Sequence, residues 1–250
     1  MKVVYHKRFN EVYSHEPAAE PGRMESIYNE LHQRFEFVIP NPASEEDLRL
    51  VHSESHIESV KCNSQIYELA LLAVGGAIKA SNIAVEGEPA FGLIRPPGHH
   101  AGRGSSWGFC YFNNIAISVE RLRREGRIRK AVIVDIDLHY GDGTANIFSS
   151  IPEVFYFHIN GRWREDFLRL LRQRLNTIEF CDIITVSAGF DTHEEDWGRI
   201  LATEDYKTIG AIIKDYAERI TGGRRYALLE GGYNISVLGR NIKSFLEGFT

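Results

Sequence analysis

The sequence has few cysteines: only three occur among its 250 residues, and none belongs to a C-x-x-C pair. They lie far apart, at Cys62, Cys110 and Cys181. Small domains that depend on disulfides carry more cysteines at closer spacings. The sequence therefore argues against a disulfide framework and favours a protein of a reducing compartment.

Long apolar runs are also lacking. No stretch of 18 consecutive apolar residues occurs, and the residues after Met1 form no extended apolar segment of the kind found in signal peptides. We therefore expect a soluble, cytoplasmic protein with no membrane partner.

A strong charge of either sign is absent. The formal net charge is −5, and 25% of the residues are charged while 43% are hydrophobic. Such a chain can bury a sizeable core, and it lacks the basic excess that a nucleic-acid partner requires. A small acidic excess is compatible with a cationic substrate but is weak evidence for one. No repeat or low-complexity linker interrupts residues 1–250, so we expect one domain; the oligomeric state stays open.

Segments with the apolar pattern of strands alternate along the chain with segments of helical spacing. The predicted strands cover 2–5, 91–94, a run that starts at 132, 154–157, 183–186 and 226–229, and the predicted helices cover 23–35, a short segment from 44, 66–80, 113–124, 165–175 and 203–220. This alternation predicts the α/β fold class, with a parallel sheet covered by helices on both faces.

The most informative stretch is a β-branched run that leads into D-x-D-x-H, with Asp135, Asp137 and His139 at every second position. In an extended chain this period places the three side chains on one side of the backbone. Buried carboxylates must be paired or bound to a metal. For this motif alone, a solvated strand end closed by a glycine turn accounts for the residues equally well.

Three further polar clusters follow predicted strands: His99 and His100 after a Pro-Pro-Gly turn, Asp191 after 183–186, and residues 230–234 after 226–229. Taken singly, each has an ordinary explanation, as surface histidines, a turn aspartate and a Gly-Gly turn. Together they lie at the carboxyl ends of strands, where parallel α/β sheets bind ligands. They supply zinc-type ligands, histidines for proton transfer and a tyrosine hydroxyl.

Five segments resemble the signature blocks of the zinc-dependent histone deacetylase family, which includes acetylpolyamine amidohydrolases, acetoin-utilisation proteins and many prokaryotic members. They are RPPGHHA at 95–101, GFCYFNN at 108–114, DIDLHYGDGT at 135–144, SAGFD at 187–191 and EGGY at 230–233. The resemblance runs over essentially the whole chain in the family's order. It implies a single-domain arginase/deacetylase fold with a central parallel sheet of about eight strands.

The resemblance also implies roles at the metal. Zinc would be bound by Asp137, His139 and Asp191. A structural monovalent cation, K⁺ or Na⁺, would lie behind it, held by backbone carbonyls and the first aspartate of D-x-D. Asp135, Asp137 and His139 could supply those groups here.

The remaining roles concern acid–base catalysis and the substrate. The resemblance pairs His99 with Asp135 and His100 with Asp142, and we expect His100 to act as general base and then acid while His99 acts electrostatically. Tyr233 would donate to the substrate carbonyl and then to the oxyanion. By the same resemblance Gly108 and Phe109 would line the acyl channel, and the reaction would be hydrolysis of an N-acetylated amine to amine and acetate.

The chain departs from the family pattern in two places. After His158 it runs directly into a predicted helix, and Tyr156 stands where typical members have serine. The segment after His56 is also short and shows no match to the acidic residue that clamps a peptide in lysine deacetylases. We therefore expect a shallow mouth and a small acylated amine, such as an acetylpolyamine, as substrate. A protein acetyl-lysine deacetylase and a non-catalytic acetyl-binding protein stay open as alternatives; a manganese ureohydrolase would need more aspartates.

Overall fold

The computed structural model describes residues 1–250 and is built on one seven-stranded sheet in which every neighbouring pair of strands is parallel. The strand order is β2-β1-β3-β7-β6-β4-β5. The strands are β1 (Lys2–Val4), β2 (Glu36–Val38), β3 (Ala90–Gly92), β4 (Ala131–Asp135), β5 (Val154–His158), β6 (Ile183–Ala188) and β7 (Arg225–Leu229). The predicted α/β class is confirmed, with seven strands in place of about eight.

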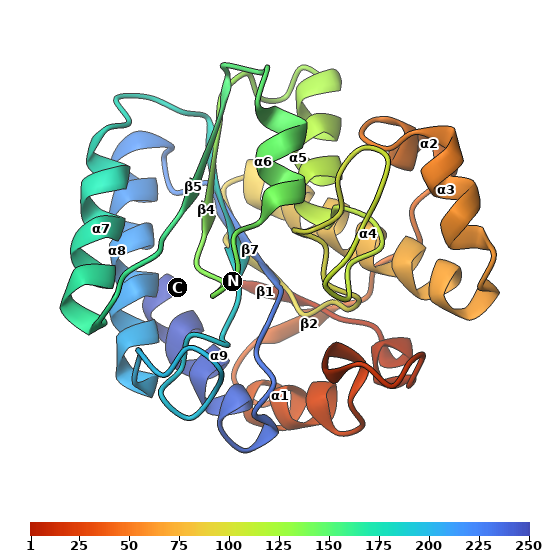
Figure 1. Cartoon of the computed structure of the whole chain (residues 1–250). Coiled ribbons are helices and arrows are strands. Elements are labelled where there is room, and N and C mark those ends of the chain that lie inside the picture. The colour runs from red at the N-terminus through yellow and green to blue at the C-terminus, as the bar shows by residue number, and fades with distance from the viewer.

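Helices cover both faces of the sheet: α7, α8, α9 and α1 lie on one side, and α4, α5 and α6 on the other (Figure 1). Their bounds are α1 (Arg23–Leu31), α2 (Glu45–Arg49), α3 (Glu54–Lys61), α4 (Ser64–Val85), α5 (Asn114–Arg124), α6 (Asp142–Phe148), α7 (Arg164–Asn176), α8 (Thr203–Ile220) and α9 (Ile235–Phe249). By length and composition α4 could cross a membrane, but 67% of its most apolar window is buried inside the domain. In this fold α4 is therefore a core helix.

The predicted elements are present with shifted ends. The helix expected over 23–35 ends at Leu31, and Ser44 caps α2 through a capping box with Asp47. The sequence did not predict β2, a three-residue edge strand without a fully buried residue, nor the amphipathic helix α9. All three cysteines are free thiols.

The short connection after β5 explains why the sheet ends there. Only residues 159–163 separate β5 from α7. A further parallel strand needs a crossover of a dozen or more residues before it can pair with the sheet. No further strand is inserted between β5 and α7, so β5 forms one edge of the sheet and β2 forms the other.

The strand order gathers the polar clusters at one edge of the sheet. The loops that carry them follow β3, β4, β6 and β7, which are consecutive in the order β3-β7-β6-β4. Because all strands are parallel, their carboxyl ends lie at the same edge. Segments that are more than 100 residues apart in the chain, such as those around His99 and Tyr233, thus face one site.

Candidate active site

The D-x-D-x-H segment leaves the sheet earlier than its alternating pattern suggests. Strand β4 ends at Asp135, and the following residues bend. The Asp135 Oδ1 atom accepts the Asp137 backbone N–H at 3.1 Å, and the Asp137 Oδ1 atom accepts the His139 backbone N–H at 2.9 Å. These are successive turns in which an aspartate caps the backbone two residues further on. The prediction of an extended chain is therefore wrong beyond Asp135.

These turns bring Asp137 and His139 to Asp191, on the loop after β6. The ligand atoms of the three residues all lie within 4.8 Å of one another. The Nδ1 atom of His139 is 3.1 Å from Asp137 Oδ1 and 2.9 Å from Asp191 Oδ2. Asp191 Oδ2 is buried and has no hydrogen-bond partner. A free carboxylate oxygen, a second carboxylate and an imidazole nitrogen thus converge on one point.

Backbone donors hold the outer oxygens of both carboxylates. The Leu138 N–H donates to Asp191 Oδ1 at 3.0 Å, and the Gly231 N–H donates to Asp137 Oδ2 at 2.8 Å. Two carboxylates and one imidazole are a ligand set that suits zinc and leaves coordination positions open for water and substrate. The donor set and the orphaned oxygen of Asp191 therefore fit this metal.

The ionisation of these residues also favours a bound cation. Burial, together with the charge of Asp137, raises the pKa of Asp191 to about 7. The hydrogen bond to Asp137 and the adjacent carboxylate of Asp191 raise the pKa of His139 to about 10. Burial opposes ionisation of Asp137, but the charge of His99 and hydrogen bonds from His139 lower its pKa. The cluster is short of positive charge, which a divalent cation would supply.

The two adjacent histidines lie beside this cluster, each in front of a carboxylate. The His99 Nδ1–H donates to Asp135 Oδ2 at 3.1 Å, and the His100 Nδ1–H donates to Asp142 Oδ1 at 2.7 Å. The ring centroids of the two histidines are 4.0 Å apart. The Nδ1 partners fix the tautomer of both rings and leave each Nε2 atom for the site.

The two histidines differ in their electrostatic surroundings. Burial lowers the pKa of His99, but the charges of Asp137 and Asp135 outweigh it and raise the pKa well above its ordinary value. Burial and the neighbouring His99 lower the pKa of His100. This arrangement favours a cationic His99 next to a neutral His100.

Glu230 holds the loop that carries His99 and His100 through hydrogen bonds to its backbone. Its Oε2 atom accepts the backbone N–H groups of Gly98 at 2.7 Å and His99 at 3.2 Å. Burial raises the pKa of Glu230 to about 7. Glu230 belongs to the polar cluster at 230–234, and its contacts show that it holds the backbone of the histidine loop in place.

Tyr233 is held by a residue that the sequence did not reveal. Asp196 Oδ2 accepts the backbone N–H groups of Tyr233 at 2.7 Å and of Asn234 at 2.8 Å. On the other side, buried Arg23 donates to the Gly232 carbonyl at 2.8 Å. Burial raises the pKa of Tyr233, so its hydroxyl stays a protonated donor.

Gly108 and Phe109 lie between these groups, both in the left-handed region of backbone conformation, with φ of 58° and 67°. A Cβ atom on Gly108 would come within 2.5 Å of the His100 ring, so glycine is required for this close approach. The Phe109 ring meets the Tyr233 ring edge-on, with centroids 5.9 Å apart.

Two half-exposed tryptophans cover the rings of His100 and Tyr233, and no local sequence pattern marks them. Trp107 lies over His100 with centroids 3.9 Å apart, and its Nε1–H donates to Asp142 Oδ2 at 2.9 Å. Trp197 stacks on Tyr233 at 4.1 Å and lies 5.8 Å from the ring of His139. They form an aromatic rim around the site.

Hollows of the surface flank this rim. One of about 510 Å³ and one of about 470 Å³ both border Trp197 and Tyr233; exposed Glu195 lines the first and exposed Glu20 lines the second. Exposed Arg199 also lines the first hollow, so the mouth is open and carries charges of both signs.

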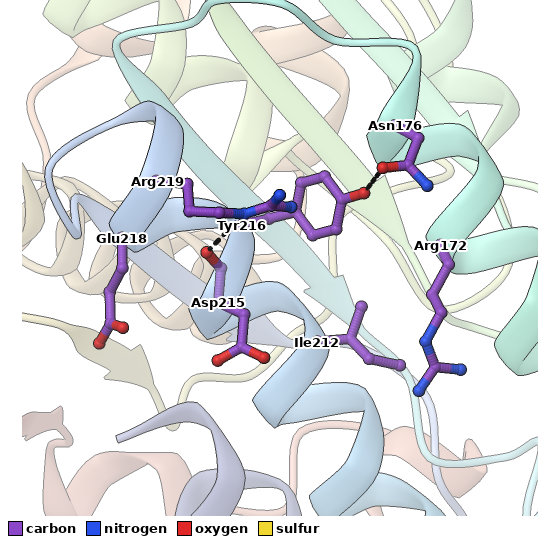
Figure 2. A pocket seen from close by; sticks show the side chains of 7 residues that line it. All are labelled: Arg172, Asn176, Ile212, Asp215, Tyr216, Glu218 and Arg219. Carbon is purple, nitrogen blue, oxygen red and sulfur yellow. Dashed lines mark hydrogen bonds between the residues drawn. The ribbon is translucent and has the colours of Figure 1, made fainter.

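Another hollow, of about 460 Å³, lies between α7 and α8, where Tyr216 is flanked by Arg219 and Asn176 (Figure 2). It lies on the second halves of these helices, which lead to the amino ends of β6 and β7. This hollow is thus at the opposite edge of the sheet from the clustered ligands.

Known proteins with similar sequences and structures bear on this site. The histone deacetylase domain family matches residues 17–167 and 160–249 of this chain. A probable deacetylase of Methanothermobacter thermautotrophicus is 30% identical over 302 residues, covering 98% of this chain and 90% of that protein. An acetylpolyamine amidohydrolase of Mycoplana ramosa is 30% identical over 73% of this chain and 63% of its own. The crystal structure of the HDA15 HD domain has the same fold, with a TM-score of 0.88 at 22% identity over 99% of this chain and 88% of that one.

The ligand cluster predicts that a variant lacking the Asp191 carboxylate loses the metal. Asp191→Ala removes the orphaned oxygen, so we expect zinc content to fall well below one per chain and any hydrolytic turnover to be lost. Elemental analysis of the purified protein measures the first effect. The matched control is Asp215→Ala, an exposed aspartate near the α7–α8 hollow. Full zinc content in the Asp191 variant would show that this cluster is not the metal site.

Proposed function

This chain belongs to the histone deacetylase family, and on that premise we propose that it is a zinc-dependent amidohydrolase that removes acetyl or related acyl groups from N-acetylated amines. The observation that carries the proposal is the convergence of Asp137, His139 and Asp191 beside two carboxylate-backed histidines. Zinc held by those three residues would supply Lewis acidity to a water molecule and to the substrate carbonyl.

In this mechanism His100 moves the proton. Its Nδ1 atom is committed to Asp142, so Nε2 is the atom that takes a proton from the attacking water. The same atom then returns the proton to the nitrogen of the leaving amine. The N–H donated by Trp107 holds Asp142 in place during both transfers.

His99 has a different place in the proposal. Its carboxylate partner Asp135 is fully buried, and the backbone N–H of His99 is bound to Glu230. A cationic His99 stabilises negative charge that builds up nearby without giving up its proton.

Tyr233 supplies the donor for the oxygen of the substrate. Its hydroxyl donates to the acyl carbonyl, and this hydrogen bond strengthens as the oxygen becomes an oxyanion. Asp196 and Arg23 fix the backbone on either side of the ring. The stacked Trp197 limits its rotation.

The open mouth supports a small acylated amine as substrate. Residues after His56 continue helix α3, and only 159–163 connect β5 to α7, so neither segment extends over the site. Exposed Glu20, in the hollow that has no lysine or arginine, favours an amine that carries a further positive charge, whereas Glu195 shares its hollow with Arg199. The similarity to an acetylpolyamine amidohydrolase is in keeping with such a substrate.

A substrate series tests this proposal. Zinc-loaded protein is assayed for acetate release from N-acetylputrescine, N-acetylspermidine, acetyl-lysine and a histone-like acetyl-lysine peptide. We expect turnover of the small amines, with kcat/KM for the peptide no more than about tenfold above that for free acetyl-lysine, a difference of about 1.4 kcal/mol. A much larger gain from the peptide would indicate a protein deacetylase. Tight binding of all four compounds without acetate release would indicate an acetyl-binding protein.

The division of roles between the histidines predicts unequal losses. General acid–base groups contribute about 10²–10⁴-fold, so His100→Ala should lower kcat/KM by that range, and by more than His99→Ala does. Zinc content is measured on the same samples, and His32→Ala, at an exposed position of the chain, serves as the control. Equal losses, or a larger loss for His99→Ala at matched zinc content, would reverse the assignment.

A further inference from the structure

The hydroxyl of Tyr156 joins the edge strand β5 to the loop that carries the ligands. It donates to Asp135 Oδ2 at 2.8 Å and accepts the backbone N–H of Gly141 at 2.9 Å. Asp135 stands behind His99, and Gly141 precedes Asp142, which stands behind His100. The Tyr156 hydroxyl therefore contacts the carboxylate partner of His99 and the residue that precedes the carboxylate partner of His100.

Asp135 is fully buried, and protein donors satisfy both of its oxygens. Oδ1 accepts the Asp137 N–H at 3.1 Å, while Oδ2 accepts His99 Nδ1–H at 3.1 Å and the Tyr156 hydroxyl at 2.8 Å. A buried carboxylate needs such partners, because it has lost its hydration. Of the three, Tyr156 provides the shortest contact.

The close approach also depends on Gly141. A Cβ atom at this position would lie 2.4 Å from Asp135 Oδ2 and 2.7 Å from the Tyr156 hydroxyl. The loop can therefore pass over the carboxylate and the phenol only where it has no side chain. Tyr156 and Gly141 form one packed unit around Asp135.

The monovalent cation that the family resemblance implies does not fit these groups. A cation needs free oxygen lone pairs, but an O–H and an N–H occupy this place. The Asp135 carbonyl accepts the Ile159 N–H at 2.9 Å, and the Asp137 carbonyl accepts from His158 Nε2 at 3.0 Å. Each of these two carbonyls already accepts one hydrogen bond, and no donor contacts the His139 carbonyl. The groups that argue most directly against K⁺ or Na⁺ are the Tyr156 hydroxyl and the Gly141 N–H, which lie where a cation beside Asp135 would lie.

We propose that Tyr156 takes the place of a structural monovalent cation in this protein. It is a positioning residue that fixes Asp135 and the Gly141 backbone by hydrogen bonds, and so orients the two histidines. Stability and turnover then show no specific response to K⁺ or Na⁺. The statement about turnover rests on the proposed deacetylase function, whereas the statement about ion binding does not.

The first measurement needs no substrate. Thermal unfolding of the zinc-loaded protein is compared in KCl, NaCl and tetramethylammonium chloride at one ionic strength of about 0.1 M, where general screening is equal. We expect the same Tm in all three salts. A Tm raised by several degrees in KCl or NaCl alone would show a bound cation and overturn the proposal.

The second measurement uses variants of Tyr156. Tyr156→Phe keeps the ring and removes only the hydroxyl, so we expect kcat to fall by about 10–100-fold, as for other residues that orient metal-site groups, with KM and zinc content unchanged. Tyr140→Phe is the matched control, since this exposed ring packs against Tyr156 at 5.8 Å. A Tyr156→Phe enzyme with wild-type kcat would refute the positioning role.

The third measurement opens the site. Tyr156→Ser removes the phenol ring and leaves a small oxygen ligand. We therefore expect the Tm of this variant to be higher in KCl than in tetramethylammonium chloride. Turnover should be restored in part by the same salt. A Tyr156→Ser variant with no ion-specific response would count against replacement of a cation by the phenol. If the wild type hydrolyses no substrate yet this stability pattern is found, the proposed function fails and the inference on Tyr156 stands.

Discussion

Two carboxylates, Asp137 and Asp191, are buried side by side against one imidazole, and the surrounding structure depends on keeping them there. Burial of like charges is unfavourable unless hydrogen bonds and a cation compensate for the lost water. The backbone supplies the hydrogen bonds by coming very close. A Cβ atom on Gly189 would lie 2.1 Å from Asp137 Oδ2, and one on Gly231 would lie 2.6 Å from the same atom. Glycine at both positions lets the backbone pass where side chains would collide, and at Gly231 the backbone N–H donates to Asp137 Oδ2.

Hydrogen bonds between carboxylates and backbone N–H groups also hold the loops around the ligand cluster. Carboxylates that do not belong to the ligand cluster accept backbone N–H groups and thereby fix the loops: Glu230 holds the histidine loop, and Asp196 holds the tyrosine loop. Each carboxylate lies on a different loop from the group it holds. The parallel sheet makes this possible, because it brings the carboxyl ends of β3, β7, β6 and β4 to one edge. The strand order therefore determines which side chains meet at the site.

The sequence revealed the residues whose chemistry is unusual for their position. Charged groups directly after apolar strands, as at Asp137 and Asp191, stand out without any structure. It did not reveal Asp196, Trp107 or Trp197, because their partners are distant in the chain and no local period marks them. It also misjudged the backbone after Asp135, since alternation of polar residues is equally produced by successive aspartate-capped turns. Edge strand β2 was missed because three partly exposed residues carry too little apolar pattern.

If this site hydrolyses an amide, as we propose, the hydroxyl of Tyr233 is the most direct place to test it. Tyr233→Phe retains the ring that packs against Trp197 and Phe109, and deletes only the hydroxyl that we propose donates to the oxyanion. Steady-state kinetics are measured together with zinc content and hydroxamate affinity on one preparation. We expect a loss of about 10²–10³-fold in kcat, with zinc content unchanged and hydroxamate affinity within about tenfold of the wild type. A Phe variant with near-wild-type kcat would contradict the proposal, and would make Tyr233 a packing residue of the turn.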